Sequence, residues 1–341
     1  MTCSFLSINN GYWLFKNHKI FGQPIEKCIT TNFNSIKKNG FWTKGRTHNI
    51  GEMHYFKLFQ YPIKNFPGLC VIKAYTNGIK IDENRSYFLA DFMTVDKTCV
   101  VGNVNISETE TRILAEEIQG TFDYFRFNVV GPGQILVSFP GRYPFFEWRF
   151  PFQLIGSDYT DYLPVNKTFR TLVRIISNSW RILKNHSINR VRIDLGENPA
   201  NFLWFHSQNR HNNTIQNLGE KINKNILFWS GNSIFSDFAR YVGFECVENI
   251  PETELDNVFL WADIEIPSED MVRLIKKWEV IDREIIPQLV NNSDKLMIEF
   301  NGGFYNNNQA IYFFYPHPRR VFLSKLLTPG KLPARFLFSN D

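Results

Sequence analysis

The chain has 341 residues, of which 43% are hydrophobic, 16% are aromatic and 21% are charged, and its formal net charge is +5. This composition is typical of a folded globular protein and excludes an intrinsically disordered one. A net charge this small gives weak support to an anionic partner, and the pI of about 8.8 alone leaves nucleic-acid binding as a disfavoured alternative.

The cysteine pattern and the N-terminal residues both predict a cytoplasmic location. The five cysteines show no CxxC motif, and an odd count in a chain of this size favours a reducing cytoplasm over a disulfide framework. The N-terminus lacks the basic and long apolar regions of a signal peptide, and no apolar run approaches the roughly 20 residues of a membrane helix. We therefore expect a cytoplasmic protein without a membrane segment.

The first part of the chain predicts a short strand over residues 4–8, ending at a turn of Asn9, Asn10 and Gly11. Residues 32–39 are typical of a helix that Gly40 closes. Residues 41–53 are polar and contain glycine, which predicts a loop.

From about residue 79 the pattern changes to that of a compact α+β unit. The segments SYFLADFMTV, KTCVVGNV, YFRFNVV and QILVSF predict antiparallel strands joined by short turns. Between them, residues 108–119 predict a helix with a capping box formed by Ser107 and Glu110. A long amphipathic helix is predicted over residues 169–184. We interpret residues 79–190 as an inserted α+β cap domain.

A second strand–helix pattern follows. Residues 202–205 and 226–229 are short apolar runs without alternation, as in strands covered on both faces. Ser233 caps a predicted helix that ends at Gly243. This order predicts a parallel sheet covered by helices, with any site where strands end and helices begin.

The C-terminal part completes the larger domain. It predicts a strand VFLWADIEI, a helix over residues 269–290 capped by Ser268, a strand over residues 295–300, and further strands in QAIYFFYP and ARFLF. Residues 1–78 and 191–341 are accordingly predicted to form an α/β core domain with a mostly parallel sheet and helices on both faces.

Motifs that carry known chemistry are scarce. The sequence has no GxSxG, Walker or GxGxxG motif and no histidine–carboxylate pattern at metal-ligand spacing. His206 and His211 are five residues apart, and a polar loop explains them better than a metal site does. Asp263 and Glu265 alternate along a strand and so share one face, where they could perform acid–base chemistry or face a partner.

Three segments together suggest a family. They are NPANFLWFHSQN, the unit NILFWSGNSIFSDFARYVGFECVE and the helix LIKKWEVIDREIIPQL. They resemble the C-terminal half of archaeal-type, cofactor-independent phosphoglycerate mutases, which belong to the alkaline phosphatase superfamily. The segments YFLADFMTVDKTCVVGNVNISETETRILAEEI and TTNFNSIKKNG resemble the family's cap-domain opening and its first helix. The resemblance implies an alkaline-phosphatase-like core with an inserted cap.

The resemblance also implies two divalent metals, a serine nucleophile and arginines that hold the substrate, and this chain lacks matching residues. Asn10 stands where the family has a metal-binding aspartate, and Asn301 stands near a further metal motif. Gly51 stands where the family has its nucleophilic serine, and an alignment shifted by one residue would place Glu52 there. The family's substrate-binding groups fall at Leu69, Leu89 and Gln134. We therefore expect no metal and no cofactor.

Two hypotheses follow. The first is a catalytically inactive pseudoenzyme that binds a protein partner, such as an active relative or an enzyme of the same pathway, through aromatic surfaces near residues 145–150 and 312–315. The alternative is a diverged enzyme that acts on a small molecule in the cleft between core and cap. Candidate residues for that cleft are Glu52, His54, Asp91, His206, Asp263 and Glu265.

Overall fold

The computed structural model of the protein describes residues 3–9, 32, 35, 41–45, 51–122, 124–209, 215–230, 235–251, 257–265, 271–301 and 310–315. The chain divides into two compact units. Unit 1 comprises Met1–Phe66 and Ile215–Asp341, and unit 2 comprises Pro67–Thr214. Unit 2 is thus inserted into the sequence of unit 1. No helix in the described ranges is long and apolar enough to cross a membrane.

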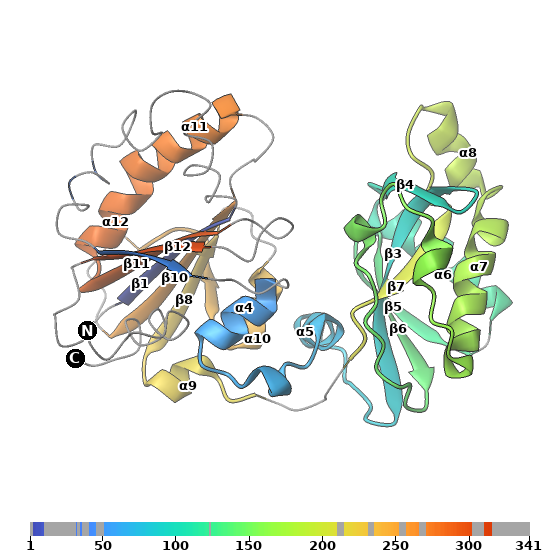
Figure 1. Ribbon diagram of the computed structural model, residues 1–341, viewed down its shortest axis with the longest axis horizontal. Helices are drawn as coiled ribbons and strands as arrows, with labels where there is room; N and C mark the ends of the chain where they lie inside the picture. Colours follow the sequence, from blue (N-terminus) through green and yellow to red (C-terminus); the bar gives the residue numbers. More distant parts are fainter. Residues whose placement is uncertain are drawn as a thin grey trace. The chain divides into compact units, whose positions relative to one another are not determined.

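Unit 1 contains a mostly parallel sheet (Figure 1). In the described part of the chain its strand order is β2–β12–β11–β1–β10–β8–β9. Strands β11, β1, β10, β8 and β9 run parallel, whereas β12 and β2 are antiparallel to their neighbours. The bounds are β1 (Cys3–Asn9), β2 (Phe41–Gly45), β8 (Asn225–Ser230), β9 (Glu245–Val247), β10 (Val258–Glu265), β11 (Lys295–Asn301) and β12 (Ala310–Tyr315).

Helices cover both faces of this sheet, which confirms the predicted fold class. Successive side chains of a strand point to opposite faces, so Leu6 of β1 joins a core cluster with Trp278, whereas Phe5 stacks on Trp261 and contacts Tyr55. The first face is covered by α11 and α12, and the second by α4 and α10 (Figure 1). The helices are α4 (Gly51–Leu58), α9 (Leu218–Ile222), α10 (Ser236–Tyr241), α11 (Met271–Val280) and α12 (Ile286–Asn291).

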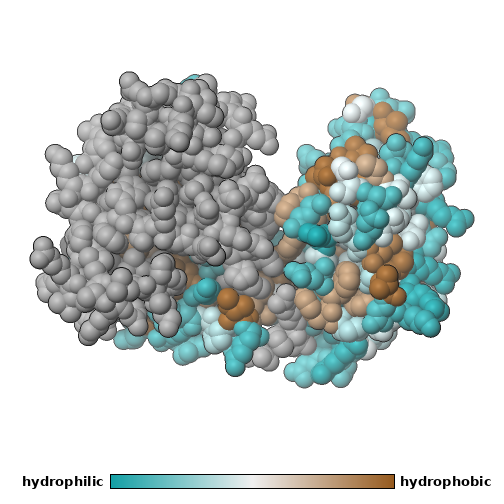
Figure 2. Space-filling model, viewed as in Figure 1, coloured by the Kyte–Doolittle hydropathy of each residue, from teal (hydrophilic) through white to brown (hydrophobic). Residues whose placement is uncertain are grey.

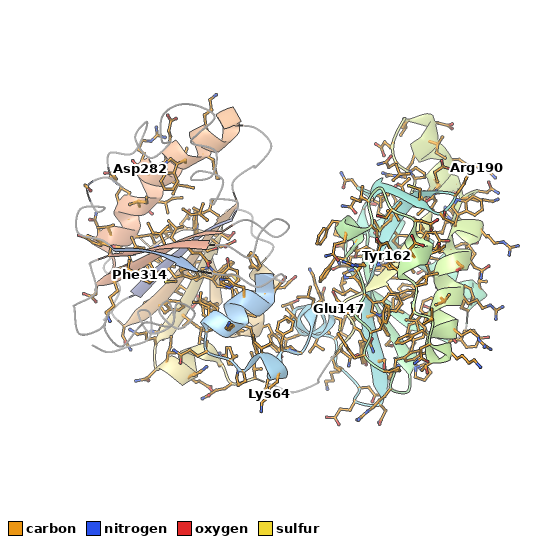
Figure 3. The ribbon with its side chains drawn as sticks, viewed as in Figure 1. Lys64, Glu147, Tyr162, Arg190, Asp282 and Phe314 are labelled. Carbon is orange, nitrogen blue, oxygen red and sulfur yellow. The ribbon has the colours of Figure 1, made fainter. Side chains whose placement is uncertain are left out.

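The predicted helix over residues 269–290 is confirmed from residue 271 onward, but its hydrogen-bond pattern is irregular. A π-helical turn, Ile281–Ile285, lies between α11 and α12. Pro287 has no N–H to donate, so the regular hydrogen-bond pattern cannot continue past it. The carbonyl of Asp282 instead accepts a hydrogen bond of 2.9 Å from the Asn32 side chain. Figure 3 labels Asp282 on this helical layer and Phe314 on the sheet.

The predicted loop over residues 41–53 was wrong, because residues 41–45 form β2 and α4 begins at Gly51. Strand β2 forms by pairing with β12, more than 260 residues later in the chain, so a local pattern could not reveal it. Of the predicted helix over residues 32–39, Asn32 and Ser35 are described and both are helical. The predicted turn at Asn10 and Gly11, the caps Ser233 and Ser268, and the strand in ARFLF lie outside the described residues.

Unit 2 contains an antiparallel sheet in which β3 pairs with β4, β6 and β7, and β5 pairs with β6. The four predicted antiparallel strands are confirmed as β3 to β6. The bounds are β3 (Arg85–Asp96), β4 (Cys99–Asn103), β5 (Arg126–Gly131), β6 (Gln134–Pro140) and β7 (Phe202–His206).

Helices α6 (Glu108–Thr121) and α7 (Arg170–Leu183) pack on one face of this sheet and complete an apolar core. Both helices were predicted, and the capping box of Ser107 and Glu110 is present. Shorter helices are α5 (Leu69–Thr76), α8 (Ser187–Asp194), and the single 3-10 turns Ile63–Asn65 in unit 1 and Pro151–Gln153, Tyr159–Tyr162 and Lys167–Phe169 in unit 2.

Strand β7 is not in the parallel sheet where the sequence placed it. All five of its residues are buried, and it runs antiparallel to β3, with Asp91 opposite Trp204. A strand covered on both faces lacks alternation whatever the direction of its neighbours, so the apolar run could not distinguish the two sheets. Both β7 and α5 contact β3, and the chain divides into its compact units between residues 66 and 67 and between residues 214 and 215.

Candidate functional site

Three polar side chains lie in one row across the parallel sheet of unit 1. Ser7 of β1 is opposite Asp263 of β10 on one side and opposite Glu299 of β11 on the other. All three residues are fully buried. Because the strands are parallel and in register, the three side chains point to the same face, close to the carboxyl ends where sites of open α/β sheets lie.

Helix α4 covers this row and contributes further polar groups. The Tyr55 hydroxyl lies 2.7 Å from Ser7 Oγ, and Ser7 Oγ donates a hydrogen bond to Asp263. His54 Nε2 lies 2.7 Å from Glu299 Oε1. Two hydrogen-bonded groups therefore link α4 to the sheet: Tyr55–Ser7–Asp263 and His54–Glu299. We call these residues the core polar cluster.

Aromatic rings close the core polar cluster from solvent. Tyr55 is 1% exposed, and its ring lies 4.6 Å from that of Trp261 and 4.8 Å from that of Phe235. His54 is 8% exposed, and its ring lies 5.2 Å from that of Tyr55. The carboxylates thus face protein donors inside a tightly packed aromatic layer.

The core polar cluster does not fit the two metal ions that the family resemblance implies. Both carboxylates hydrogen bond to protein side chains, and across the described ranges no group of three His, Cys, Asp or Glu residues could hold a metal ion. One oxygen stands out, since Glu299 Oε2 is buried and has no hydrogen-bond partner among the described residues. A buried carboxylate oxygen of this kind is costly unless it is compensated.

The sequence-predicted positions are distributed over both units. Glu52 and His54 lie on α4, two residues apart, and both are buried. Gly51 is the first residue of that helix, Asn301 is the last residue of β11 and Glu265 is the last residue of β10. Asn10 lies outside the described residues. The structure therefore brings His54 of α4 and Asp263 of β10 into the core polar cluster.

Sequence reasoning missed Ser7, Tyr55 and Glu299. A signal was present for Glu299, because it is a single charged residue within the apolar strand segment LMIEF. A lone acid in a buried strand requires a donor, which His54 provides. Ser7 and Tyr55 gave no comparable signal, because small polar residues and tyrosines are common in ordinary strands and helices.

A second polar cluster lies in unit 2, on β3 and its neighbours. Asp91 Oδ2 lies 3.2 Å from His206 Nε2, and Asp91 Oδ1 accepts a hydrogen bond of 2.8 Å from Gln134. The contact with His206 lacks the alignment of a hydrogen bond, since His206 Nε2 has no such partner among the described residues. Leu89 is opposite His206 in the strand pairing, and Leu69 begins α5. Four predicted positions, Asp91, Gln134, His206 and Leu89, thus lie together on one sheet.

Comparisons with known proteins agree with this architecture. The fold is that of the mixed α/β, phosphoglycerate-mutase-like class. The Pyrococcus horikoshii PH0037 protein matches with a TM-score of 0.61 and 15% identity over 91% of this chain and 86% of that chain. The cofactor-independent phosphoglycerate mutase of Thermoplasma acidophilum matches with a TM-score of 0.51 and 16% identity over 92% and 89%.

Sequence comparisons point to the same kind of protein. The model of 2,3-bisphosphoglycerate-independent phosphoglycerate mutase matches residues 49–189. The 2,3-bisphosphoglycerate-independent phosphoglycerate mutase 2 of Methanocaldococcus jannaschii is 24% identical over 320 residues, which cover 81% of this chain and 73% of the relative. The 2,3-bisphosphoglycerate-independent phosphoglycerate mutase of Methanosarcina barkeri is 25% identical over 154 residues, which cover 43% of this chain and 38% of the relative. The chain is thus similar to 2,3-bisphosphoglycerate-independent phosphoglycerate mutases, the family that its sequence segments resemble.

Proposed function

We propose that the protein does not catalyse the phosphoglycerate mutase reaction and instead acts as a binding, scaffold or regulatory subunit in the cytoplasm, without metal or cofactor. The observation that carries this proposal is the closure of the core polar cluster. Ser7, Asp263, His54 and Glu299 hydrogen bond in pairs and are at most 8% exposed. A nucleophile and its phosphoryl donor must meet in a site that substrate can enter.

The residues at the positions implied by the resemblance support the same proposal. Gly51, at the expected place of the nucleophile, has no side-chain oxygen to phosphorylate. Leu89 is 2% exposed and apolar, where the resemblance implies an arginine for the substrate. Without the nucleophile the chain has no side chain to accept the phosphoryl group. Without the arginine it lacks a group that binds the substrate.

The proposed partner is a protein, such as an active relative or an enzyme of the same pathway. Within residues 145–150, Phe145 is 51% exposed whereas Trp148 is 6% exposed, so this segment combines an exposed aromatic ring with a buried one. In Figure 2 hydrophobic residues interrupt a largely hydrophilic surface on the described part of the molecule. Exposed aromatic rings often serve as interface anchors.

A mutase assay on the purified full-length chain, with Mn²⁺ and Zn²⁺ supplied, tests the proposal. We expect no turnover and less than one bound metal ion per two chains by elemental analysis, while the Methanocaldococcus jannaschii relative is assayed beside it as the positive control. Turnover that Asp263→Asn abolishes would overturn the proposal. Co-elution of this protein with the active relative in size-exclusion chromatography then tests whether an active relative is the partner. Phe145→Ala should weaken that co-elution if the exposed ring lies in the interface.

A second candidate function is a diverged enzyme that uses the core polar cluster, together with Glu52 and Glu265, for a small-molecule reaction. Glu299 Oε2, which is buried and has no hydrogen-bond partner among the described residues, favours it, because such groups persist where function requires them. A screen of small phosphorylated and carboxylated metabolites by thermal shift distinguishes the candidates. A metabolite that raises the melting temperature of the native chain but not of Asp263→Ala supports the enzyme. If no metabolite in the screen raises the melting temperature, the non-catalytic subunit is supported.

A further inference from the structure

Three side chains of unit 2, a hydroxyl, an imidazole and a carboxylate, lie next to one another in that order. Ser207 Oγ lies 2.8 Å from His206 Nδ1, and His206 Nε2 lies 3.2 Å from Asp91 Oδ2. The Asp91–His206 contact is close enough for an ion pair but is not aligned as a hydrogen bond, so the carboxylate favours a proton on Nε2 through its charge, and Nδ1 is then the acceptor for the serine. A base that takes the serine proton and a carboxylate that orients the base are the elements of an activated nucleophile.

The sheet holds the imidazole and the carboxylate in place. His206 is the last residue of β7 and is 4% exposed, with its ring 5.7 Å from that of Phe150. Asp91 lies at the centre of β3, where Gln134 of the neighbouring strand binds its other oxygen at 2.8 Å. The Asp91 side chain remains 24% exposed, so the group is accessible from one side. Asp91 and Gln134 are thus suited to position His206.

The backbone at Ser207 is strained, with φ +49°. Residues other than glycine rarely adopt this left-handed conformation, and it persists only where neighbouring groups enforce it. Here Asn209 donates its N–H to Tyr87 O at 3.0 Å, and its side chain accepts the Tyr87 N–H at 2.8 Å. The Gln208 side chain accepts the N–H of Phe146 at 3.1 Å. A serine on a strained turn directly after a strand is typical of a hydrolase nucleophile.

The same turn offers hydrogen-bond donors for a developing oxyanion. The backbone N–H groups of Ser207 and Gln208 lie beyond the end of β7, and among the described residues none accepts a hydrogen bond from them. The N–H of the residue after the nucleophile is a common oxyanion donor. The ring of Phe150, stacked on that of Phe152, provides an apolar wall beside His206. An apolar wall suits an uncharged acyl group better than a phosphate.

We propose that Ser207 is the nucleophile of a second site, which hydrolyses small carboxylic esters. Ser207 Oγ forms a bond to the carbonyl carbon while its proton moves to His206 Nδ1. The ester C–O bond breaks, and the leaving alkoxide takes that proton and departs as an alcohol. Water then attacks the acyl-serine and gives a proton to Nδ1; the acid leaves and the proton returns to Ser207 Oγ. The site lies wholly in unit 2 and does not depend on the core polar cluster of unit 1.

A fluorophosphonate probe, which reacts with activated serines, tests the proposal on the full-length chain. We expect one adduct, located at Ser207 by peptide mass mapping, and hydrolysis of p-nitrophenyl acetate. Ser207→Gly should abolish labelling and leave the melting temperature unchanged or higher, because glycine adopts the left-handed backbone without strain. Ser187→Ala, which changes an exposed serine of the same unit, is the matched control and should label normally.

Variants of the other two residues separate catalysis from folding. His206→Gln should slow labelling on the order of 100-fold or more, the size of a general-base contribution. Asp91→Asn should slow it less and change the pH profile of the labelling rate, which a purely structural role would not do. Absence of an adduct, an adduct on another serine, or normal labelling of Ser207→Gly would overturn the proposal.

Discussion

The Nε2 atom of His54 lies 2.7 Å from Oε1 of Glu299, in a contact between helix α4 and strand β11 that are 245 residues apart in sequence. The His54 side chain is 9% exposed, and that of Glu299 is fully buried. A contact of such long range, made inside the core, specifies how α4 lies across the parallel sheet. Its energetic role can be measured separately from any activity.

Removal of one partner of this pair should destabilise the protein more than removal of both. We expect His54→Leu to lower the free energy of unfolding by about 3 kcal/mol, because it leaves a buried carboxylate without its donor. The double variant His54→Leu/Glu299→Met should recover most of that loss, since two apolar groups of similar volume need no partner. Urea unfolding of the two variants beside the native chain provides the measurement. Equal losses in the single and double variants would show that the pair is not coupled.

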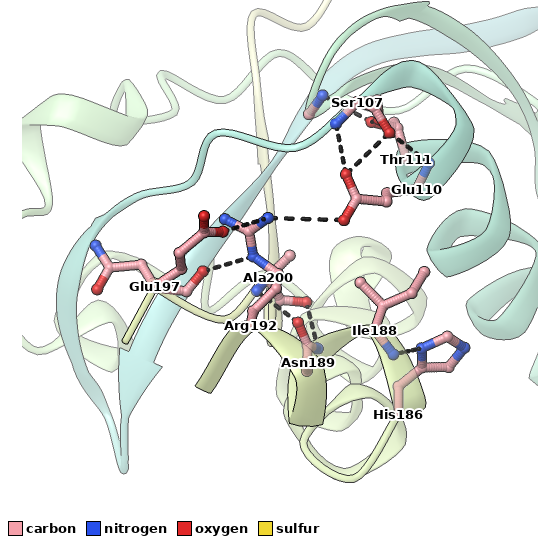
Figure 4. Close-up of polar contacts among 11 residues, drawn as sticks. Ser107, Glu110, Thr111, His186, Ile188, Asn189, Arg192, Glu197 and Ala200 are labelled. Carbon is pink, nitrogen blue, oxygen red and sulfur yellow. Dashed lines mark hydrogen bonds and ion pairs between the residues drawn. The ribbon is translucent and has the colours of Figure 1, made fainter. Parts of the chain in front are cut away.

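Asn189 should be essential to the stability of unit 2. Its side chain is fully buried, donates to Leu183 O at 2.9 Å and Ala200 O at 3.0 Å, and accepts the Ala200 N–H at 2.8 Å (Figure 4). It thereby connects α7, α8 and the segment that enters β7. We expect Asn189→Ala to cost about 3 kcal/mol, because three buried groups lose their partners. Asn189→Asp should cost as much, since a carboxylate cannot donate to two carbonyls, and a loss below 1 kcal/mol by calorimetry would contradict this role.

The capping box of α6 should make stability depend on pH. Hydrogen bonds from the Ser107 backbone and hydroxyl, aided by the nearby charge of Arg192, hold the pKa of Glu110 below its ordinary value (Figure 4). A carboxyl whose pKa is lower in the folded state contributes stability at pH values above its unfolded pKa. This contribution is lost as the pH falls through the folded pKa.

Comparison of Glu110→Gln with the native chain isolates that contribution. We expect a difference of about 0.5 kcal/mol at pH 7, because the carboxylate is partly exposed, and a difference that shrinks as the pH falls from 7 into the acid range. Ser107→Ala should cost about 1 kcal/mol at pH 7 through loss of the cap. Urea titrations across this pH range measure both effects, and a Glu110→Gln difference that grows in acid would refute the assigned sign.

Local patterns predicted the helix boundaries better than they predicted the sheet partners. The capping box of Ser107 and Glu110 and the strands β3 to β6 were evident from sequence, because turns, caps and alternation are short-range features. Strand β7 was assigned to the wrong sheet, because burial on both faces removes the alternation that would have distinguished its neighbours. Pairing is decided by residues far apart in the chain, which no local pattern records.

The candidate sites show the same limit. Asp91 and His206 were singled out for their chemistry, and so were His54 and Asp263, but sequence gave no reason to pair Asp91 with His206 or His54 with Glu299. The strand register creates both relationships. Ser207 was not considered, because its positive φ is a property of the folded turn and cannot be predicted from the presence of a serine in the sequence.

The cysteines should differ sharply in reactivity. Burial raises the pKa of the Cys70 thiol, and its Sγ contacts Tyr87 O at 3.6 Å, whereas Cys99 and Cys246 are exposed. The thiolate is the reactive form, so a thiol that is both buried and kept protonated should not react in the folded chain. A variant with Cys70 as its sole cysteine should give no signal with Ellman's reagent in buffer and one thiol in urea, while a variant with Cys99 alone should react in both. Prompt reaction of Cys70 in buffer would mean that α5 separates readily from β3.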